Sequence, residues 1–175
     1  MAPILKLTHD GVPLTLPRVQ FTDAALPWRA AIRRAAEPLV RDGAVTPSYP
    51  EAAIAAVEQW GPYCDLGQGI AMPHARPEAG VNEIAVSFLR CWRPVLLADD
   101  ADHPVEVFLM LAATDSAAHL DVVSRLAQVL MDDQAVRRLK AATTADAVQA
   151  VFASPPADHP QGNAARESTE ERYGQ

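Results

Sequence analysis

The stretch Gly69-Ile70-Ala71-Met72-Pro73-His74-Ala75-Arg76-Pro77 decides how the middle of this chain folds and where its chemistry lies. Its apolar start, Ile70-Ala71-Met72, predicts a short buried strand at the edge of a sheet. Pro73 has no N–H and a fixed φ, so it ends strand pairing and holds the next residue in a defined direction. His74 is therefore expected at a rigid strand end, where α/β proteins place their reactive groups.

A cation follows this histidine two residues later. Arg76 carries a planar guanidinium, which suits an oxyanion or a phosphoryl group. The simpler interpretation places His74 and Arg76 in solvent, in a loop rich in proline. The residues of this run alone leave both interpretations open.

Length and composition restrict the class of protein. The chain has 175 residues, 49% of them hydrophobic, and a formal net charge of −7. This length suits one domain with a sizeable core. The acidic balance argues against nucleic acid as the main partner. We expect no signal peptide and no membrane-spanning segment, because no apolar run is long enough. Cys64 and Cys91 lack metal-type spacing and are expected to be buried free thiols in a reducing compartment.

Helices are predicted where apolar side chains recur at helical spacing next to cap residues. They are expected over residues 28–40, 52–60, 117–131, 134–142 and 145–152. Pro38 predicts a kink or an early end in the first of these helices. Ser48 and Glu51 form a predicted capping box for the second, and Ser116 and Thr144 are predicted N-caps. The predicted core stripe of the helix over 117–131 consists of Leu120, Val123, Leu126, Ala127 and Leu130.

Strands are predicted from short apolar or alternating runs. They are expected over residues 12–16 or 19–21, and over 70–72, 84–89 and 105–113. The run over 84–89 alternates between two faces, whereas 105–113 is almost continuously apolar. It is therefore expected to be a central strand buried on both faces. The stretch 91–103 is expected to be irregular or a hairpin.

This order of elements predicts a single α/β domain in which a sheet is flanked by helices. The domain is expected over residues 19–153. Residues 1–18 form a Pro-rich segment ahead of it. Residues 154–175 are polar and poor in large apolar side chains, so we expect a disordered tail.

A longer pattern around His74 resembles a known family. Gln59 followed by Leu66-Gly67-Gln68-Gly69-Ile70-Ala71-Met72-Pro73-His74-Ala75 resembles the phosphohistidine signature of the mannitol/fructose-type (type-2) IIA components. These belong to the bacterial phosphoenolpyruvate-dependent sugar phosphotransferase system. Gly61-Pro62-Tyr63 and Gly80-Val81-Asn82, which flank the signature, are similar to the ascorbate-specific IIA branch. His119-Leu120 is a second feature of the family, and the resemblance extends over residues 28–152.

The resemblance implies a fold and a set of site residues. The fold would be a mixed β-sheet flanked by helices. His74 would be the phosphorylated nucleophile, reacting through Nε2, and His119 would lie beside it and stabilise the phosphoryl group. With Ser116 as N-cap, His119 would lie in the first helical turn, where backbone N–H groups favour anions. Arg76 and Ser116 are the predicted phosphate-binding residues.

One position departs from the family pattern. Many relatives outside the ascorbate branch carry an arginine on the helix ahead of the signature, about where Glu58 stands here. A carboxylate cannot supply a positive charge. Arg76 is therefore the nearest substitute.

The function that the resemblance implies is a cytoplasmic IIA phosphocarrier, a phosphotransferase. It would accept a phosphoryl group on His74 from the histidine-containing phosphocarrier protein. It would donate that group to a cysteine of a IIB partner, so that a membrane IIC component takes up and phosphorylates a sugar, with ascorbate favoured. No metal or organic cofactor is expected, and a homodimer is compatible with the sequence.

Other functions also fit part of the pattern. A regulatory module could use the same histidine to sense phosphorylation and bind a regulator without moving sugar. A hydrolase could use His74 and His119 as base and acid. A zinc site from His74, His103 and His119 is disfavoured, because no closely spaced ligand pair supports it.

Overall fold

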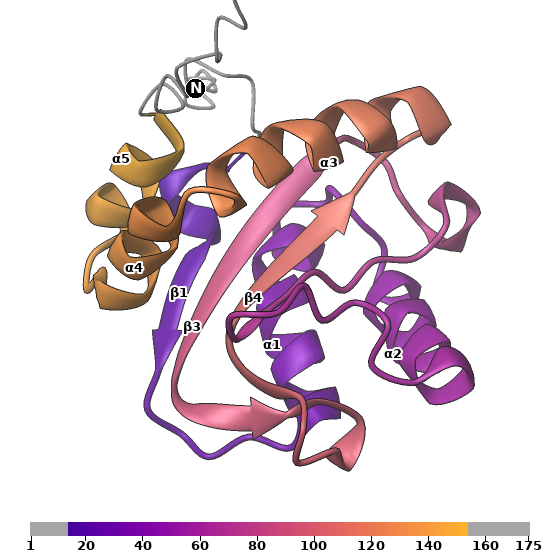
Figure 1. The fold of residues 1–175 in the computed structure, drawn as a ribbon. Coiled ribbons are helices and arrows are strands. Elements are labelled where there is room, and N and C mark those ends of the chain that lie inside the picture. Colours follow the sequence, from indigo (N-terminus) through magenta and orange to yellow (C-terminus); the bar gives the residue numbers. More distant parts are fainter. Residues whose placement is uncertain (1–13, 154–175) are drawn as a thin grey trace, which may run out of the picture.

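A four-stranded sheet lies at the centre of residues 14–153, the part of the chain that the structure, a computed structural model, describes (Figure 1). The strands are β1 (Val19–Thr22), β2 (Ile70–Ala71), β3 (Ala85–Leu96) and β4 (Pro104–Ala112). Their order in the sheet is β1-β3-β4-β2. The β3 and β4 strands are antiparallel, whereas β1 and β2 each run parallel to their neighbour. The predicted mixed sheet is therefore confirmed, and of the two alternatives for the first strand, 19–21 is correct.

Helices cover both faces of this sheet (Figure 1). They are α1 (Trp28–Arg41), α2 (Ser48–Trp60), α3 (Ser116–Leu130), α4 (Asp133–Ala141) and α5 (Ala145–Ala153). Short 3-10 turns, η1 to η3, span Leu16–Arg18, Pro77–Ala79 and Leu97–Asp99. One hydrophobic cluster joins α1 and α2 to one face, and a second joins α3, α4 and α5 to the other. The prediction of an α/β domain with a flanked sheet is confirmed. Predictions for residues 1–13 and 154–175 lie outside the described residues.

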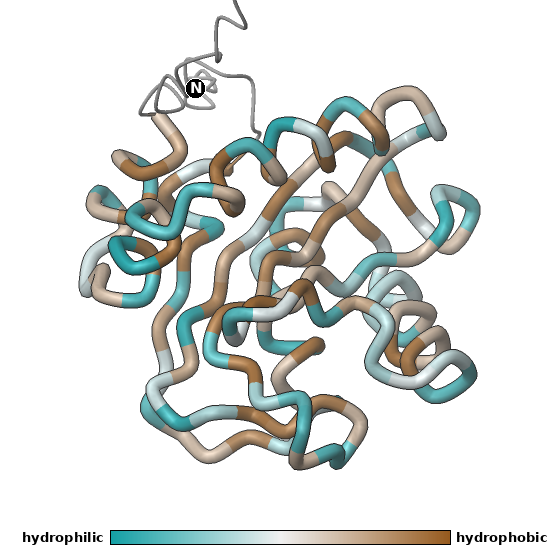
Figure 2. Tube along the Cα trace, in the orientation of Figure 1, coloured by the Kyte–Doolittle hydropathy of each residue, from teal (hydrophilic) through white to brown (hydrophobic). Residues whose placement is uncertain are grey.

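The β4 strand is buried on both faces, as its continuous apolar sequence predicts. Val107, Leu109 and Leu111 belong to the cluster under α3 to α5. Phe108 and Met110 belong to the cluster under α1 and α2. Each buried side chain of this size contributes about 1.5–3 kcal/mol relative to exposure. Figure 2 shows apolar residues concentrated along the strands, with polar residues on the outer surfaces of the helices.

The β3 strand is longer than predicted. Its pairing with β4 is interrupted between Arg90 and Val95 and then resumes, so the strand ends at Leu96 and not at 89. Arg90 is buried at this irregularity, where its guanidinium donates to the carbonyls of Cys91 and Lys140. A buried arginine with several backbone acceptors is an arrangement that hydrophobic alternation cannot predict. Of residues 91–103, only the part after Leu96 forms the hairpin turn.

Of the two effects predicted for Pro38, a kink or an early end, the early end does not occur, because α1 continues to Arg41. Proline leaves the carbonyl four residues earlier without its helical donor. Here that carbonyl, of Arg34, accepts a hydrogen bond from the Gln20 side chain at 2.7 Å. An acceptor that a neighbouring strand satisfies allows the helix to continue.

The predicted capping box at the start of α2 is wrong. Pro47 is the N-cap and makes no side-chain cap bond. The Ser48 hydroxyl instead donates to the carbonyl of Ala79, and Glu51 pairs with Arg33 on α1 at 2.7 Å. Long-range partners therefore compete successfully for both side chains. The Thr144 cap of α5 is confirmed, since its hydroxyl accepts from the Ala147 N–H.

The core stripe of α3 differs from the predicted one. Val122 and Leu126 are buried against the sheet, but Leu120 is 69% exposed. Ala127 is exposed as well. Only one side of this helix rests on the sheet, so the buried face is narrower than the apolar face. No helix among residues 14–153 is long and apolar enough to cross a membrane.

Candidate active site

His74 lies just beyond the end of β2, at the edge of the sheet. Ile70 and Ala71 pair with β4, and Pro73 follows without a donor. The chain nevertheless stays beside β4, because the Leu111 N–H donates to the Pro73 carbonyl at 3.3 Å. The strand-end position predicted for His74 is confirmed.

The ring of His74 is held by its own backbone. Its Nδ1 lies 2.9 Å from the carbonyl oxygen of Met72. A carbonyl oxygen can only accept, so Nδ1 must carry the proton in this contact. The neutral ring then has its lone pair on Nε2. The atom left free to attack is thus the one that the resemblance implies.

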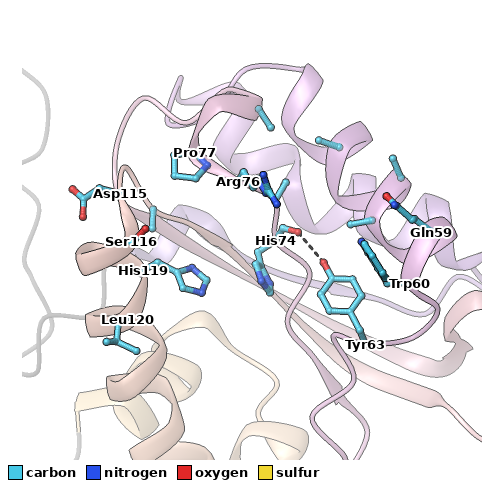
Figure 3. A pocket seen from close by; sticks show the side chains of 16 residues that line it. Gln59, Trp60, Tyr63, His74, Arg76, Pro77, Asp115, Ser116, His119 and Leu120 are labelled. Atoms are coloured by element: carbon cyan, nitrogen blue, oxygen red, sulfur yellow. Dashed lines mark hydrogen bonds between the residues drawn. The ribbon is translucent and has the colours of Figure 1, made fainter.

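His119 projects from α3 toward His74 (Figure 3). The two ring centroids are 5.1 Å apart, with an angle of 42° between the ring planes. Burial, followed by the proximity of His74, lowers the pKa of His119. At neutral pH the ring is therefore neutral, and it offers one N–H donor close to the nucleophile. The structure brings together the two histidines singled out in the sequence.

Ser116 is not the N-cap of α3. That position belongs to Asp115, whose carboxylate accepts from the Ala118 N–H at 2.8 Å. Three consecutive residues, Thr114 to Ser116, can all cap a helix, and only the backbone decides among them. Asp115 is extended, whereas Ser116 is the first helical residue and lines the pocket around the histidines. His119 consequently lies one position deeper in the helix than predicted, and its N–H donates to the Asp115 carbonyl.

Arg76 is an exposed cation of this pocket. It lies on the stretch that follows His74, and both residues line the same cavity (Figure 3). Among residues 14–153, no carboxylate forms an ion pair with it. Glu58 pairs instead with Arg29 of α1 at 2.7 Å. Arg76 therefore supplies a positive charge beside His74 that no carboxylate of residues 14–153 neutralises by direct pairing.

Tyr63 is a site residue that sequence reasoning named only as part of the resemblance. Its ring meets His74 edge-on, with centroids 5.8 Å apart and an angle of 73°. Its hydroxyl donates to the His74 carbonyl at 3.1 Å (Figure 3). Burial raises the pKa of Tyr63 to about 12, so the hydroxyl keeps its proton. A loop residue eleven positions before the histidine has no sequence signal for this contact.

The cavity in front of the histidines lies between α2 and α3 and has a volume of about 970 Å³. Alanines of α2, at positions 52, 55 and 56, form one wall. Trp60 and Leu120 stand on opposite sides and are 70% and 69% exposed. An open site with large apolar side chains on its rim is suited to contact with another protein.

Two other side chains considered as reactive groups, Cys64 and His103, do not line this cavity. Cys64 is buried, and burial raises its pKa to about 12, so it is a neutral thiol and no nucleophile. His103 pairs with a carboxylate away from the cavity. Its Nδ1 lies 2.6 Å from the Asp65 carboxylate, whose hydrogen bond raises the pKa of His103.

Comparison with known proteins shows the family of this chain. The model of the phosphoenolpyruvate-dependent sugar phosphotransferase system EIIA 2 family matches residues 14–154. The chain belongs to the EIIA 2 family. Its members are phosphotransferase relay components, and this chain is one of them.

Individual EIIA 2 relatives agree with the assignment. The chain is 38% identical over 133 residues to SgcA of Escherichia coli (strain K12), which is named as a phosphotransferase IIA component; the match covers 76% of this chain and 93% of that protein. It is 33% identical over 118 residues to the ascorbate-specific EIIA component of the same strain, covering 67% and 77%.

A solved structure supports the fold. The complex of the mannitol enzyme IIA with phosphorylated enzyme IIB from Escherichia coli matches with a TM-score of 0.70 at 28% identity, covering 80% of this chain and 98% of that one.

Proposed function

We propose that this EIIA 2 protein accepts a phosphoryl group on Nε2 of His74 and passes it to a cysteine of a IIB partner. The observation that carries the proposal is the contact between His74 Nδ1 and the Met72 carbonyl at 2.9 Å. In the neutral ring this bond fixes the tautomer, with the proton on Nδ1 and the lone pair on Nε2 available at the open cavity that His74 lines. An uncharged nucleophile that is also a good leaving group is what a phosphoryl relay needs.

The donor would be the phosphohistidine of the histidine-containing phosphocarrier protein. A P–N bond forms at His74 Nε2 while the donor P–N bond breaks, and the electron pair of that bond returns to the donor nitrogen. In the second step a IIB thiolate attacks the same phosphorus. A P–S bond forms, and the bonding pair returns to Nε2. Both steps depend mainly on positioning and on charge stabilisation.

Three residues are proposed to stabilise the phosphoryl oxygens. His119 would donate its ring N–H from 5.1 Å away, measured between ring centroids. The arriving negative charge would also favour protonation of this ring, which opposes the lowered pKa of the free protein. Arg76 would supply the cation and Ser116 a hydroxyl from the first turn of α3. The Asp115 carboxylate already occupies a backbone N–H at the start of α3 and adds a negative charge there, which disfavours an anion. His119 and Arg76 are therefore expected to stabilise the phosphoryl group more than the backbone N–H groups do.

The proposed partners follow from the exposed apolar residues around the cavity and from the EIIA 2 relatives. Exposed Trp60 and Leu120 border the cavity, so two proteins could dock there in turn and reach the same nitrogen. The mannitol IIA–IIB complex supports a IIB protein as the second partner. Ascorbate is the proposed sugar because of the ascorbate-specific relative. We further propose a cytoplasmic protein that serves a membrane IIC component through IIB.

The proposal is tested with a reconstituted relay. The protein is mixed with phosphoenolpyruvate, enzyme I and the phosphocarrier protein, and intact mass is measured for wild type and His74→Ala. We expect one acid-labile phosphoryl group on wild type and none on the variant. An unlabelled, folded wild type would contradict the proposal, and phosphoester turnover without relay proteins would favour a hydrolase.

Transfer onward separates transport from regulation. Labelled protein is mixed with ascorbate-type and mannitol-type IIB proteins, and loss of the label to the IIB cysteine is followed. Rapid transfer to the ascorbate-type protein is expected. A label that no IIB protein accepts would favour the regulatory module.

A further inference from the structure

The hydrogen-bond ladder between β2 and β4 continues past the end of β2. The register pairs Ile70 with Val107, and the Val107 N–H donates to the Gly69 carbonyl. Four residues later the same rule pairs His74 with Leu111, and the Leu111 N–H does donate to the Pro73 carbonyl. The next bond of a parallel ladder would run from the Ala75 N–H to the Leu111 carbonyl.

A tyrosine hydroxyl occupies the place of that bond. The Ala75 N–H donates to the hydroxyl of Tyr49 at 3.1 Å, and this hydroxyl donates to the Leu111 carbonyl. Tyr49 reaches the position from α2 and is fully buried. Its lone pairs accept from the Ala75 N–H, and its one proton faces two acceptors, the Leu111 carbonyl and the Ala75 carbonyl at 3.3 Å. Burial raises the pKa of Tyr49, so the proton stays at neutral pH.

This inserted hydroxyl separates the chain at Ala75 from β4 by the width of one oxygen atom. His74 is the residue immediately before the separation. Its ring is tied back to Met72 on one side. Its main chain is tied through Ala75 to Tyr49 on the other. The Tyr63 hydroxyl holds the His74 carbonyl of the same peptide. Bonds on both sides of His74 together fix the direction of the ring, because a bond on one side alone still allows rotation of the peptide.

We propose that Tyr49 is a positioning residue for phosphoryl transfer, whose hydroxyl lifts the His74–Ala75 peptide off the sheet edge and aims His74 Nε2 into the cavity. This inference rests on the proposed function of His74. Tyr49 itself touches neither the phosphoryl group nor a partner, since it has no exposed surface. Its removal should therefore change the rate of transfer and not the binding of the donor protein.

The test is Tyr49→Phe, which keeps the ring and removes only the hydroxyl. Single-turnover transfer from the phosphorylated phosphocarrier protein is measured over a range of donor concentrations. We expect the maximal rate to fall about tenfold or more, as small misplacements of a reacting atom do, with half-saturation unchanged within about twofold. Without the hydroxyl, Ala75 is free to close onto Leu111 or to remain unpaired, and both shift His74.

A matched control separates positioning from lost stability. Ser87→Ala also removes a fully buried hydroxyl that donates to a backbone carbonyl, that of Ala35, between β3 and α1. It is expected to lower the free energy of unfolding without changing the maximal rate. A Tyr49→Phe protein that transfers as fast as wild type and Ser87→Ala would overturn the inference.

A second readout does not depend on relay activity. Amide hydrogen exchange of wild type should show the Ala75 N–H strongly protected, because its acceptor is buried. The nitrogen shifts of the His74 ring should report a single Nδ1–H tautomer in wild type and a mixture in Tyr49→Phe. Rapid exchange at Ala75, or an unchanged ring in the variant, would overturn the inference even if wild type were never labelled. An unlabelled wild type with both expected signatures would instead count against the proposed function alone.

Discussion

The Nδ1 atom of His74 lies 2.9 Å from the carbonyl oxygen of Met72, two residues earlier in the same chain. The acceptor is a backbone atom of the segment that carries the nucleophile, and the Tyr49 and Tyr63 hydroxyls hold the main chain of that segment in place. Pro73 lies between Met72 and His74 and restricts the backbone that joins them. The neighbouring His119, Tyr63 and Arg76 then act on a ring whose reactive nitrogen is already defined.

Removal of the second histidine should slow transfer without abolishing it. His119→Ala deletes an N–H donor beside the nucleophile, and loss of one such donor costs about 100-fold or more in preorganised sites. The labelling rate from the phosphocarrier protein measures this loss. His119→Gln keeps an N–H donor and should recover part of the rate. Equal rates for wild type and His119→Ala would contradict a stabilising role.

The exposed cation is expected to matter in the same reaction. Arg76→Ala should slow phosphoryl transfer by about tenfold to 100-fold, because a charge-assisted contact to a phosphoryl oxygen is lost. Arg76→Lys should restore part of the rate. Arg93→Ala, which removes an exposed arginine of β3 that does not line the cavity, serves as the control and should have no effect. An Arg76→Ala rate equal to this control would mean that Arg76 is a solvated loop residue.

Gly69 should tolerate a side chain less well than its neighbour Gly67. Both have a positive φ, which costs a non-glycine residue about 1–2 kcal/mol. A Cβ on Gly69 would also lie 3.0 Å from the Glu106 carboxylate, whereas nothing lies within 4 Å of a Cβ on Gly67. Denaturant unfolding should therefore show a larger loss of stability for Gly69→Ala than for Gly67→Ala. Equal losses would show that only the backbone conformation matters.

The lowered pKa of His119 predicts how stability depends on pH. An unfolded histidine titrates near pH 6.5, and burial lowers this value in the folded protein. As pH falls below about 6.5, the unfolded chain binds a proton that the folded chain does not, so the free energy of unfolding decreases. Wild type should therefore lose more stability than His119→Gln between pH 7.5 and 5.5 in urea unfolding. His103 has the opposite sign, but it is present in both proteins and cancels.

A steeper loss in the His119→Gln variant would contradict the assigned direction of this pKa shift. The comparison is made at high salt as well, since His74 also contributes to the lowered pKa through its charge. Screening by salt should reduce the contribution of the His74 charge to the lowered pKa of His119 and leave the contribution of burial.

The sequence predicts well those features that depend on neighbouring residues. Pro73 ends β2, continuous apolar residues bury β4 on both faces, and Thr144 caps α5. It fails where distant segments provide the hydrogen-bond partner, as the Ala79 carbonyl does for Ser48 and the Gln20 side chain does for the Arg34 carbonyl. These contacts depend on the finished packing and leave no local pattern.

The same distinction between local and long-range features applies to the candidate site. His74 and His119 follow from a motif and its resemblance, but their 5.1 Å approach is set by the tertiary fold. The roles of Tyr49 and Tyr63 have no sequence signal, because each acts through a backbone atom and not through a recognisable side-chain pair. The N-cap predicted at Ser116 is wrong by one residue, because Asp115 is a residue type equally suited to that position.

The central claim is that phosphorus bonds to Nε2 of His74, and the atom itself can be observed. The protein is labelled with ¹⁵N-histidine, phosphorylated through the relay and examined for ³¹P–¹⁵N coupling, with the ring assigned by comparison with His74→Gln. Coupling to Nε2 of His74 alone, with Nδ1 still protonated, is the result that the structure predicts. Coupling to Nδ1, or to a nitrogen of His119, would contradict the account.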